Sequence, residues 1–313
     1  LMAGIIQTTF DTTANKDLLK RGSLRTIFDT TVRKAQTYSS GMYNMLTTKD
    51  EYERDQRMAG LDSAQELAEG QNIPVQTPVL GTSKTYTQRQ FGTGFRMTFR
   101  MDFFNKYSLW SRWAKDLGKV MTEAKDIELN VLWNNPTSTT LTCGVGFDSL
   151  ALASDSHTGL KPGTTDDNYD NYLNSGLSYT SLESARYYYK TLIDDMGQLM
   201  GAIPDTLYYE PTQHFTVIEL LGSEGKPHEF SNTKSALGEM SIKPYENPRL
   251  TSTTAWGLLA KGDDNFDVNC FTAMEPRMFT KDAPDNTQDR ICTALQMFTY
   301  GWGDSRCVYV GKA

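Results

Sequence analysis

Apolar and polar side chains alternate strictly over residues 95–103. This period of two predicts a β-strand with one buried face and one face that meets water or a charged partner. A few residues later, apolar side chains recur at three- and four-residue spacing, which predicts an unbroken helix that ends near Trp133. At 1.5 Å per residue such a helix would be roughly 40 Å long, more than a small domain needs. The residues expected to pack along its apolar seam are Trp110, Trp113, Leu117, Val120, Ala124, Ile127 and Val131.

The segment that precedes this strand is polar. Residues 60–90 contain few large apolar side chains and are interrupted by glycines and prolines, so they cannot bury themselves. We expect a long two-stranded β-ribbon whose tip lies near residues 73–81. Because an isolated ribbon is only marginally stable in water, it is expected to lean on another subunit. The candidate inter-subunit contacts are Ile73, Pro74, Val79, Arg96 and Arg100, with ordinary solvated arginines as the alternative for the last two.

The region after the long helix mixes helices and short strands. Pro136 is expected to stop that helix, because proline disfavours helix at the residue before it. Thr180 and Glu183 form a capping box that opens a second amphipathic helix, whose spacing continues to Leu199. The other elements expected here are an exposed loop at 159–176, a strand at 207–209 and a third helix at 212–221.

The end of the chain changes to a strand pattern. Strands are predicted at 255–260, 270–281, 290–300 and 307–310, separated by polar turns. Consecutive strands with short connections usually pair antiparallel, so this sheet can cover the seam of the long helix. The elements together predict an α+β fold.

Composition narrows the class of protein. A length of 313 residues suggests about two domains, and no apolar run is long enough to cross a membrane. A net charge of -7 argues against wrapping nucleic acid, so any contact with DNA is expected to be weak. The four cysteines are widely spaced and are expected to be reduced, buried thiols. No signal-peptide pattern opens the chain, which favours synthesis in a reducing cytoplasm.

Candidate chemistry is sparse. The three histidines lie on separate elements, and Asp155 with His157 is the one pair that suggests half of a catalytic triad. Asp166, Asp167 and Asp170 suggest a loose oxygen-ligand cluster but lack the spacing of a calcium loop. The glycine pairs at 92–94 and 144–146 lack the rest of a phosphate loop and predict turns or bulges. We therefore expect no catalytic, cofactor-binding or metal-binding residues and no enzyme activity.

Several motifs and their order resemble a known family. A basic arm, a polar ribbon, a long helix, an inserted α/β region and a terminal long-stranded sheet follow one another. This order resembles the major capsid proteins of tailed bacteriophages, with the Hong Kong 97-like fold, and in particular the Mu-like head subunits. The motifs that carry the resemblance are Lys84-Thr85-Tyr86-Thr87, Phe91-Gly92-Thr93-Gly94-Phe95-Arg96-Met97-Thr98, Phe147-Asp148-Ser149-Leu150, Ile203-Pro204-Asp205-Thr206-Leu207 and Trp256-Gly257-Leu258-Leu259.

The resemblance implies a domain plan and a function. It implies an N-terminal arm at 1–48, an extended loop at 49–105, a peripheral domain from 106–140 and 262–313, and an axial domain at 141–261. Such a subunit self-assembles into pentamers and hexamers of an icosahedral phage head that encloses double-stranded DNA. Its partners would be copies of itself and possible portal, scaffold or decoration proteins, with packaged DNA contacted weakly and no membrane. The expected location is the virion, after assembly in the host cytoplasm.

Three alternatives remain open from the residues alone. A cellular nanocompartment shell of the encapsulin type would share the fold and enclose an enzyme cargo. A hydrolase would use Asp155 and His157. A carbohydrate-binding tail module is the third alternative.

Overall fold

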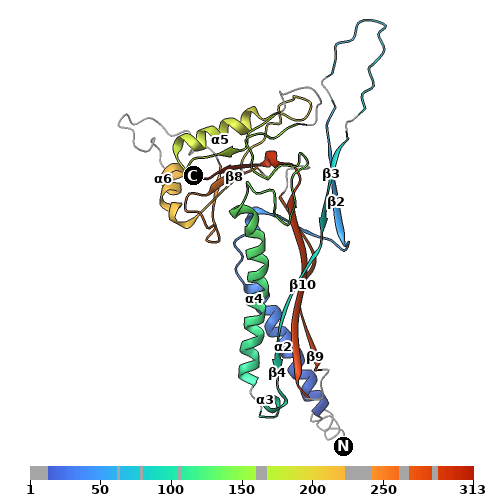
Figure 1. Cartoon of the computed structure of the whole chain (residues 1–313), viewed down its shortest axis with the longest axis vertical. Helices are drawn as coiled ribbons and strands as arrows, with labels where there is room; N and C mark the ends of the chain where they lie inside the picture. The colour runs from blue at the N-terminus through green and yellow to red at the C-terminus, as the bar shows by residue number, and fades with distance from the viewer. Residues whose placement is uncertain are drawn as a thin grey trace, which may run out of the picture. The chain divides into compact units, whose positions relative to one another are not determined.

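The computed structural model describes residues 13–61, 64–77, 80–104, 107–159, 168–222, 241–260, 268–283 and 288–313 (Figure 1). They separate into two compact units. Unit 1 takes the described residues of segments 1–37, 88–127 and 272–298, and unit 2 those of segments 38–87, 128–271 and 299–313. Among the described helices, none has both the length and the hydropathy needed to cross a bilayer.

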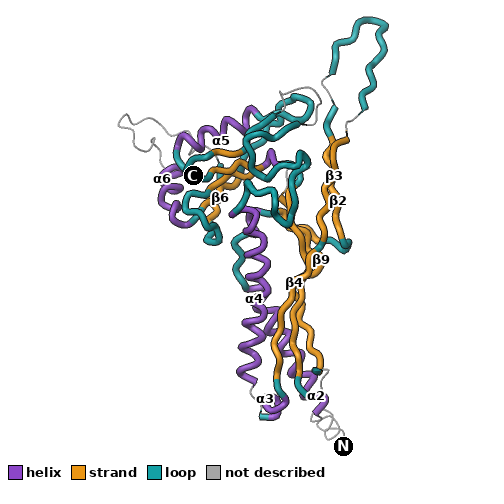
Figure 2. Tube along the Cα trace, in the orientation of Figure 1, coloured by secondary structure: helices purple, strands orange, loops and turns teal. Residues whose placement is uncertain are grey.

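Unit 1 packs two helices against long strands. Helix α2 (Thr13–Lys34) and the first part of α4 (Tyr107–Asn134) share a core with β4 (Arg89–Met97), β9 (Val268–Asp282) and β10 (Arg290–Trp302) (Figure 2). Strands β4 and β10 are antiparallel, and β9 lies on the other side of β10. The strand that follows β9 in the strand order is β1 (Asn44–Thr47), whose residues belong to unit 2. The predicted long helix is therefore confirmed. The single terminal sheet is wrong in part, because only β9 and β10 of the four predicted terminal strands lie in this sheet, whereas the strands predicted at 255–260 and 307–310 belong to a separate sheet of unit 2.

Large apolar side chains close the core of unit 1. They come from both helices and all three long strands. Gly118 of α4 has no side chain, which lets α2 approach α4 closely. A Cβ atom at Gly118 would lie 3.3 Å from the Phe28 carbonyl oxygen, tighter than ordinary contacts. The buried members are Leu24, Phe28, Met97, Trp110, Ala114, Leu117, Met121, Met278, Cys292 and Ala294.

The buried stripe of α4 differs from the predicted seam. Trp110 and Leu117 are buried as expected, but Val120 and Ile127 are each 49% exposed. Trp113, Ala124 and Val131 are only partly buried. Two apolar stripes overlap on this helix, because Trp113 and Ala114 are neighbours that both satisfy three-four spacing from Trp110. The core takes the stripe through Ala114 and Met121, which places Val120 and Ile127 on the flank.

The predicted strand at 95–103 is also corrected. Strand β4 ends at Met97, and residues 99–103 form the short helix α3 (Phe99–Phe103). Asp289 ends the strand, because its carboxylate accepts hydrogen bonds from the Phe99 backbone N–H at 2.9 Å and from Arg96 Nε at 2.8 Å. Phe103 is consequently 71% exposed instead of buried.

The glycines at 92–94 lie inside β4, where the register against β10 is continuous. The turn or bulge expected at this position is therefore wrong. A Cβ atom at Gly94 would lie 2.6 Å from the Cys292 carbonyl oxygen, so glycine is required for the close approach of the two strands.

Unit 2 contains a five-stranded mixed sheet with helices and a separate ribbon. The strand order is β5-β11-β8-β6-β7, in which β8 pairs antiparallel with both neighbours. Among the described residues of this unit, twelve buried side chains, including Tyr189 and Trp256, form its core. The element bounds are β5 (Tyr172–Leu173), α5 (Tyr179–Thr191), β6 (Thr206–Tyr209), α6 (His214–Gly222), β7 (Lys243–Glu246), β8 (Trp256–Leu259) and β11 (Val308–Gly311), with short 3-10 turns at Ser40–Met42, Pro211–Gln213 and Ser305–Cys307.

Helix α5 begins and ends earlier than its pattern predicts. Its N-cap is Ser178, whose side chain forms a capping box with Ser181 in place of the expected Thr180 and Glu183. The helix ends at Thr191, and the following residues fold back so that Ile193 bridges Leu199. The apolar spacing continues past the helix, but Leu199 is 72% exposed.

The ribbon predicted before the long helix is confirmed. Strands β2 (Tyr52–Met58) and β3 (Leu80–Thr87) pair antiparallel, with Tyr52 opposite Thr87 and Asp55 opposite Lys84. Figure 2 draws the chain between these strands as a long loop.

The corrected seam gives the first testable prediction. Leu117→Ala should destabilise the subunit by about 2–5 kcal/mol, because it opens a cavity in the core of unit 1. Val120→Ala, which truncates a half-exposed side chain three residues further on, should cost less than about 1 kcal/mol. Urea unfolding followed by tryptophan fluorescence measures both values. Equal losses in the two variants would contradict the assignment of the seam.

Candidate assembly interface

The ribbon carries apolar side chains that its own chain leaves in water. Ile73 is 76% exposed and Val75 is 94% exposed, and Pro74 between them is exposed as well. Tyr52, Met58 and Leu80 on the paired strands are also exposed. Of the tip residues expected to contact another subunit, Val79 lies outside the described residues. Ile73 and Pro74, the described tip residues among these candidates, are exposed and can contact a partner.

A buried charge network fixes one strand of the ribbon base, by which we mean the paired strands β2 and β3. Arg57 of β2 is 8% exposed and forms a two-point ion pair with Asp195, including a bond of 3.0 Å from Nε to Oδ2. Arg306 donates to the same carboxylate at 2.6 Å and to Asp304 at 3.0 Å. Burial by itself raises the pKa of Asp195, but the hydrogen bonds and charges of Arg306 and Arg57 lower it overall. The carboxylate therefore stays ionised between two arginines.

The second strand of the ribbon is held at one backbone carbonyl. Lys84 Nζ donates to the Trp302 carbonyl oxygen at 3.1 Å and lies 3.6 Å from the centroid of the Trp302 ring. Tyr86 donates its hydroxyl to the same oxygen at 2.7 Å. Burial lowers the pKa of Lys84 to about 8. Both strands of the ribbon are therefore fastened within unit 2 by buried polar contacts, while Ile73 and Val75 at its tip remain exposed.

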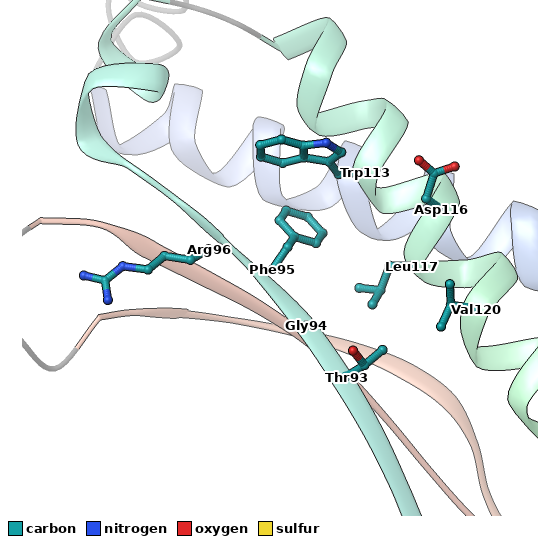
Figure 3. A pocket seen from close by; sticks show the side chains of 8 residues that line it. All are labelled: Thr93, Gly94, Phe95, Arg96, Trp113, Asp116, Leu117 and Val120. Atoms are coloured by element: carbon teal, nitrogen blue, oxygen red, sulfur yellow. The ribbon is translucent and has the colours of Figure 1, made fainter.

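Unit 1 has an apolar groove on the flank of α4. A cavity of about 290 Å³ lies between this helix and β4, and Trp113 packs edge-on against Phe95 with ring centroids 5.6 Å apart (Figure 3). The half-exposed Val120 lies on the same wall. Figure 3 shows Arg96 pointing away from the groove, where it pairs with Asp289 of its own chain. Arg100 is exposed near the Phe104 ring, at 6.0 Å from its centroid.

The suggested catalytic pair is not formed. His157 is fully buried and its Nδ1 lies 2.6 Å from Asp148 Oδ2, while Asp155 is exposed. Tyr169 stacks on the imidazole at 4.9 Å, so this histidine is enclosed and has no access to a substrate. Burial raises the pKa of Asp148, but its bonds to His157 and to backbone N–H groups lower it overall. The pair is a packing element of unit 2.

Other candidate chemistry also has structural roles. Asp166 and Asp167 lie outside the described residues, and Asp170 accepts a hydrogen bond from the Tyr172 backbone N–H at 2.9 Å. Within the described part of the chain, no three His, Cys, Asp or Glu side chains are grouped to hold a metal ion. All four cysteines are free and buried. Another cavity, of about 310 Å³ in unit 2, is lined by four tyrosines, by Leu192 and Ile193, and by small polar side chains.

Comparison with known families identifies the chain. The family model described as "Phage capsid protein" matches residues 81–311, well over half of the sequence. The chain belongs to the phage capsid protein family. It is accordingly a structural shell protein of the virion that self-associates, and its family consists of structural proteins and not enzymes.

Solved capsid structures share the fold at low sequence identity. The capsid of the cyanophage P-SCSP1u is 12% identical, with a TM-score of 0.57 over 87% of this chain and 86% of that chain. The mature capsid of bacteriophage PhiM1 is 11% identical, with a TM-score of 0.56 over 88% and 87%. A virus-like particle from Pyrococcus furiosus is 9% identical, with a TM-score of 0.55 over 93% and 98%. No curated protein sequence matches the chain.

These similarities confirm the predicted fold of the capsid protein. It is the Hong Kong 97-like fold, a mixture of helix and sheet with an extended ribbon and a long helix on a sheet. The Mu-like branch stays a prediction.

Sequence patterns missed the buried network of Arg57, Asp195 and Arg306, because these residues are far apart in the chain and share no motif.

The network at the ribbon base gives the second prediction. Asp195→Asn should destabilise the capsid subunit by about 3 kcal/mol or more, because it leaves Arg57 and Arg306 buried without their counter-charge. Asp155→Asn removes an exposed carboxylate and should change stability by less than about 0.5 kcal/mol. Urea unfolding of soluble subunits measures both. Similar values would show that the network has no special role.

Lys84 gives the third prediction. Its pKa is about 8 in the folded chain and is expected near 10.4 in the unfolded chain, so the unfolded state binds more protons between these pH values. The contribution of Lys84 to stability should therefore rise with pH across this window, by up to about 1.4 kcal/mol per pH unit. The unfolding free energy of wild type minus that of Lys84→Met measures this rise. Lys190→Met, which replaces an exposed lysine, is the control, and an equal rise in both variants would contradict the role of Lys84.

Proposed function

We propose that this capsid protein forms pentamers and hexamers that close into an icosahedral phage head around double-stranded DNA. The exposed apolar tip of the ribbon carries this proposal. Ile73 and Val75 remain in water while both strands of the ribbon are fastened at the base, so another copy must supply the burying surface. Each contact is modest, and many copies sum them into a stable shell through multivalency.

The groove of unit 1 is our proposed receptor for the ribbon of a neighbouring copy. It is lined by apolar side chains of α4 and β4, including Phe95, Trp113 and Val120. An apolar groove and an apolar tip both lose solvent-exposed area when they meet, which favours association by roughly 25 cal/mol per Å². Arg96, which is 45% exposed at its side chain, would lie at the edge of this contact.

We also propose the division of the chain into domains that the capsid fold implies. Residues 1–48 would act as an arm, 49–105 as the extended loop, 106–140 with 262–313 as the peripheral domain, and 141–261 as the axial domain around the capsomer centre. Portal, scaffold and decoration proteins are proposed as further partners, and the host cytoplasm as the place of assembly. The phage capsid family match favours a phage head over a nanocompartment shell.

The ribbon tip can be tested directly. Ile73→Asp with Val75→Asp should give soluble, folded subunits that fail to form shells, because the charges cannot enter an apolar interface. The matched control is Asn72→Asp with Thr77→Asp, which adds the same charge at exposed polar positions of the same loop. Light scattering and negative-stain microscopy measure assembly, and circular dichroism checks folding. Closed shells from the Ile73 and Val75 variant would overturn the proposed role of the ribbon.

A further inference from the structure

Helix α5 forms one wall of the cavity of about 310 Å³ in unit 2, which we call the tyrosine pocket. The opposite walls come from residues 168–170 and from Tyr309 of β11. Ligand pockets in proteins range from about 300 Å³ upward, so this pocket has the size for one inserted side chain and not for a large ligand. The side chains of α5 that line it recur at three- and four-residue spacing and therefore form one stripe of the helix: Ser184, Tyr187, Tyr188 and Thr191.

The charge of the tyrosine pocket is negative. Among the described residues that line it, Asp170 is the one with a charged side chain. Its carboxylate accepts a hydrogen bond from the Tyr172 backbone N–H at 2.9 Å, but it forms no ion pair with any described cation. Arg186 and Lys190 of the same helix do not line the pocket. One carboxylate at this site therefore lacks a counter-charge.

Tyr309 leaves a second polar group without a partner. This residue is 5% exposed, and its hydroxyl forms no hydrogen bond with the described residues. The hydroxyls of Tyr169 and Tyr188, in contrast, are hydrogen-bonded within unit 2 at 2.7 and 3.3 Å. Burial, and then the negative charge of Asp170, raise the pKa of Tyr309 to about 12. An unpartnered hydroxyl at a buried residue is costly, so a ligand that donates a hydrogen bond to it gains stability.

The ring of Tyr187 is open to a ligand. It is 71% exposed, and no described ring or cation is stacked on it. The Tyr169 ring is already covered, by His157 at 4.9 Å and by Arg306 at 4.8 Å between centroids or from the guanidinium carbon. The charge of Arg306 is balanced by two carboxylates, so it does not cancel that of Asp170. A free aromatic ring beside an unpaired carboxylate attracts a cation.

We propose that the tyrosine pocket binds the guanidinium group of an arginine side chain from a second copy of the chain. A guanidinium is planar, so it can stack on Tyr187, and its several N–H groups can donate to Asp170 and to the Tyr309 hydroxyl at once. A lysine ammonium has no plane to stack. A neutral sugar would leave Asp170 without a counter-charge.

Self-association makes a second copy the occupant. Capsid proteins of this family associate with their own copies, so another copy is the protein nearest to each subunit. Ring-shaped capsomers require heterologous contacts, in which two different surfaces of the chain meet. A pocket on one copy and an arginine elsewhere on the next satisfy this requirement, and this step rests on the proposed function. The exposed arginines Arg25, Arg33 and Arg277 form no ion pair with the described residues and are available for the contact.

The binding test uses the full chain as unassembled subunits and N-acetyl-arginine amide as the probe. N-acetyl-citrulline amide is the neutral reference, because it has nearly the same shape without the charge. Saturation-transfer difference NMR measures both affinities. Since Asp170 is exposed, wild type should prefer the arginine probe by about two- to fivefold. Asp170→Asn should abolish this preference, and Tyr187→Ala should weaken binding of the arginine probe by about two- to fivefold.

Matched controls separate the pocket from general surface effects. Glu219→Gln removes an exposed carboxylate of α6, and Phe215→Ala removes an aromatic side chain that is 77% exposed on the same helix. Both controls should bind the arginine probe as wild type does. Equal losses in the controls, or no preference for arginine in wild type, would overturn the proposal. Tighter binding of methyl glucoside than of the arginine probe would also overturn it and identify a saccharide site.

Assembly tests the second copy as the occupant. Asp170→Asn and Tyr187→Ala should raise the subunit concentration that is needed for shell formation in light scattering, because one contact is lost in every copy. Asp170→Glu keeps the charge and should restore assembly. Loss of probe binding with unchanged assembly would exclude a second copy as the occupant.

The outcome is separable from that of the proposed function, because probe binding is measured on unassembled subunits. Wild-type shells without any preference for the arginine probe would refute only the role of the tyrosine pocket. A wild-type chain that never forms shells would refute the proposed function, whatever its subunits bind.

Discussion

A two-stranded ribbon has no second layer of its own, and this constraint governs how the capsid protein is built. Backbone pairing between β2 and β3 satisfies hydrogen bonds, but it buries little apolar area. The chain compensates at the base, where Arg57 is neutralised by Asp195 and where Lys84 and Tyr86 share the Trp302 carbonyl oxygen. At the tip, Ile73 and Val75 have no such support within the chain. A subunit that is stable at one end of the ribbon and incomplete at the other is suited to assembly with its copies.

Buried charges at the ribbon base favour a specific geometry more than a large stability. Taking Arg57, Asp195 and Arg306 out of water is costly, and the cost is recovered only when the carboxylate receives both arginines at close range. An apolar contact at the same place would tolerate many ribbon orientations, because it is not directional. A ribbon that must meet a neighbouring copy benefits from a base with one preferred arrangement.

Electrostatics and packing are distributed over different surfaces of unit 1. The sheet-facing stripe of α4 is buried with Leu117 and Met121, one flank lines an apolar groove at Val120, and the exposed face carries charges of both signs, including Lys115, Asp116 and Lys119. A helix of 28 residues offers enough surface for three such faces. The same element can therefore hold the fold together and, as we propose, receive a neighbouring subunit.

The sequence by itself determined which elements exist. The periods of apolar residues predicted the long helix, the ribbon and the terminal strands, and their order indicated the capsid fold that structures near 10% identity share. Local periodicity carries this information because it reflects whether a segment can bury one face. Only the tertiary structure decided which face is buried: the overlapping stripes through Trp113 and Ala114 are equivalent until the core of unit 1 forms around Ala114. It also decided that Asp289 ends β4 and that His157 pairs with Asp148 and not with Asp155. Such contacts join residues far apart in sequence, and no local pattern records them.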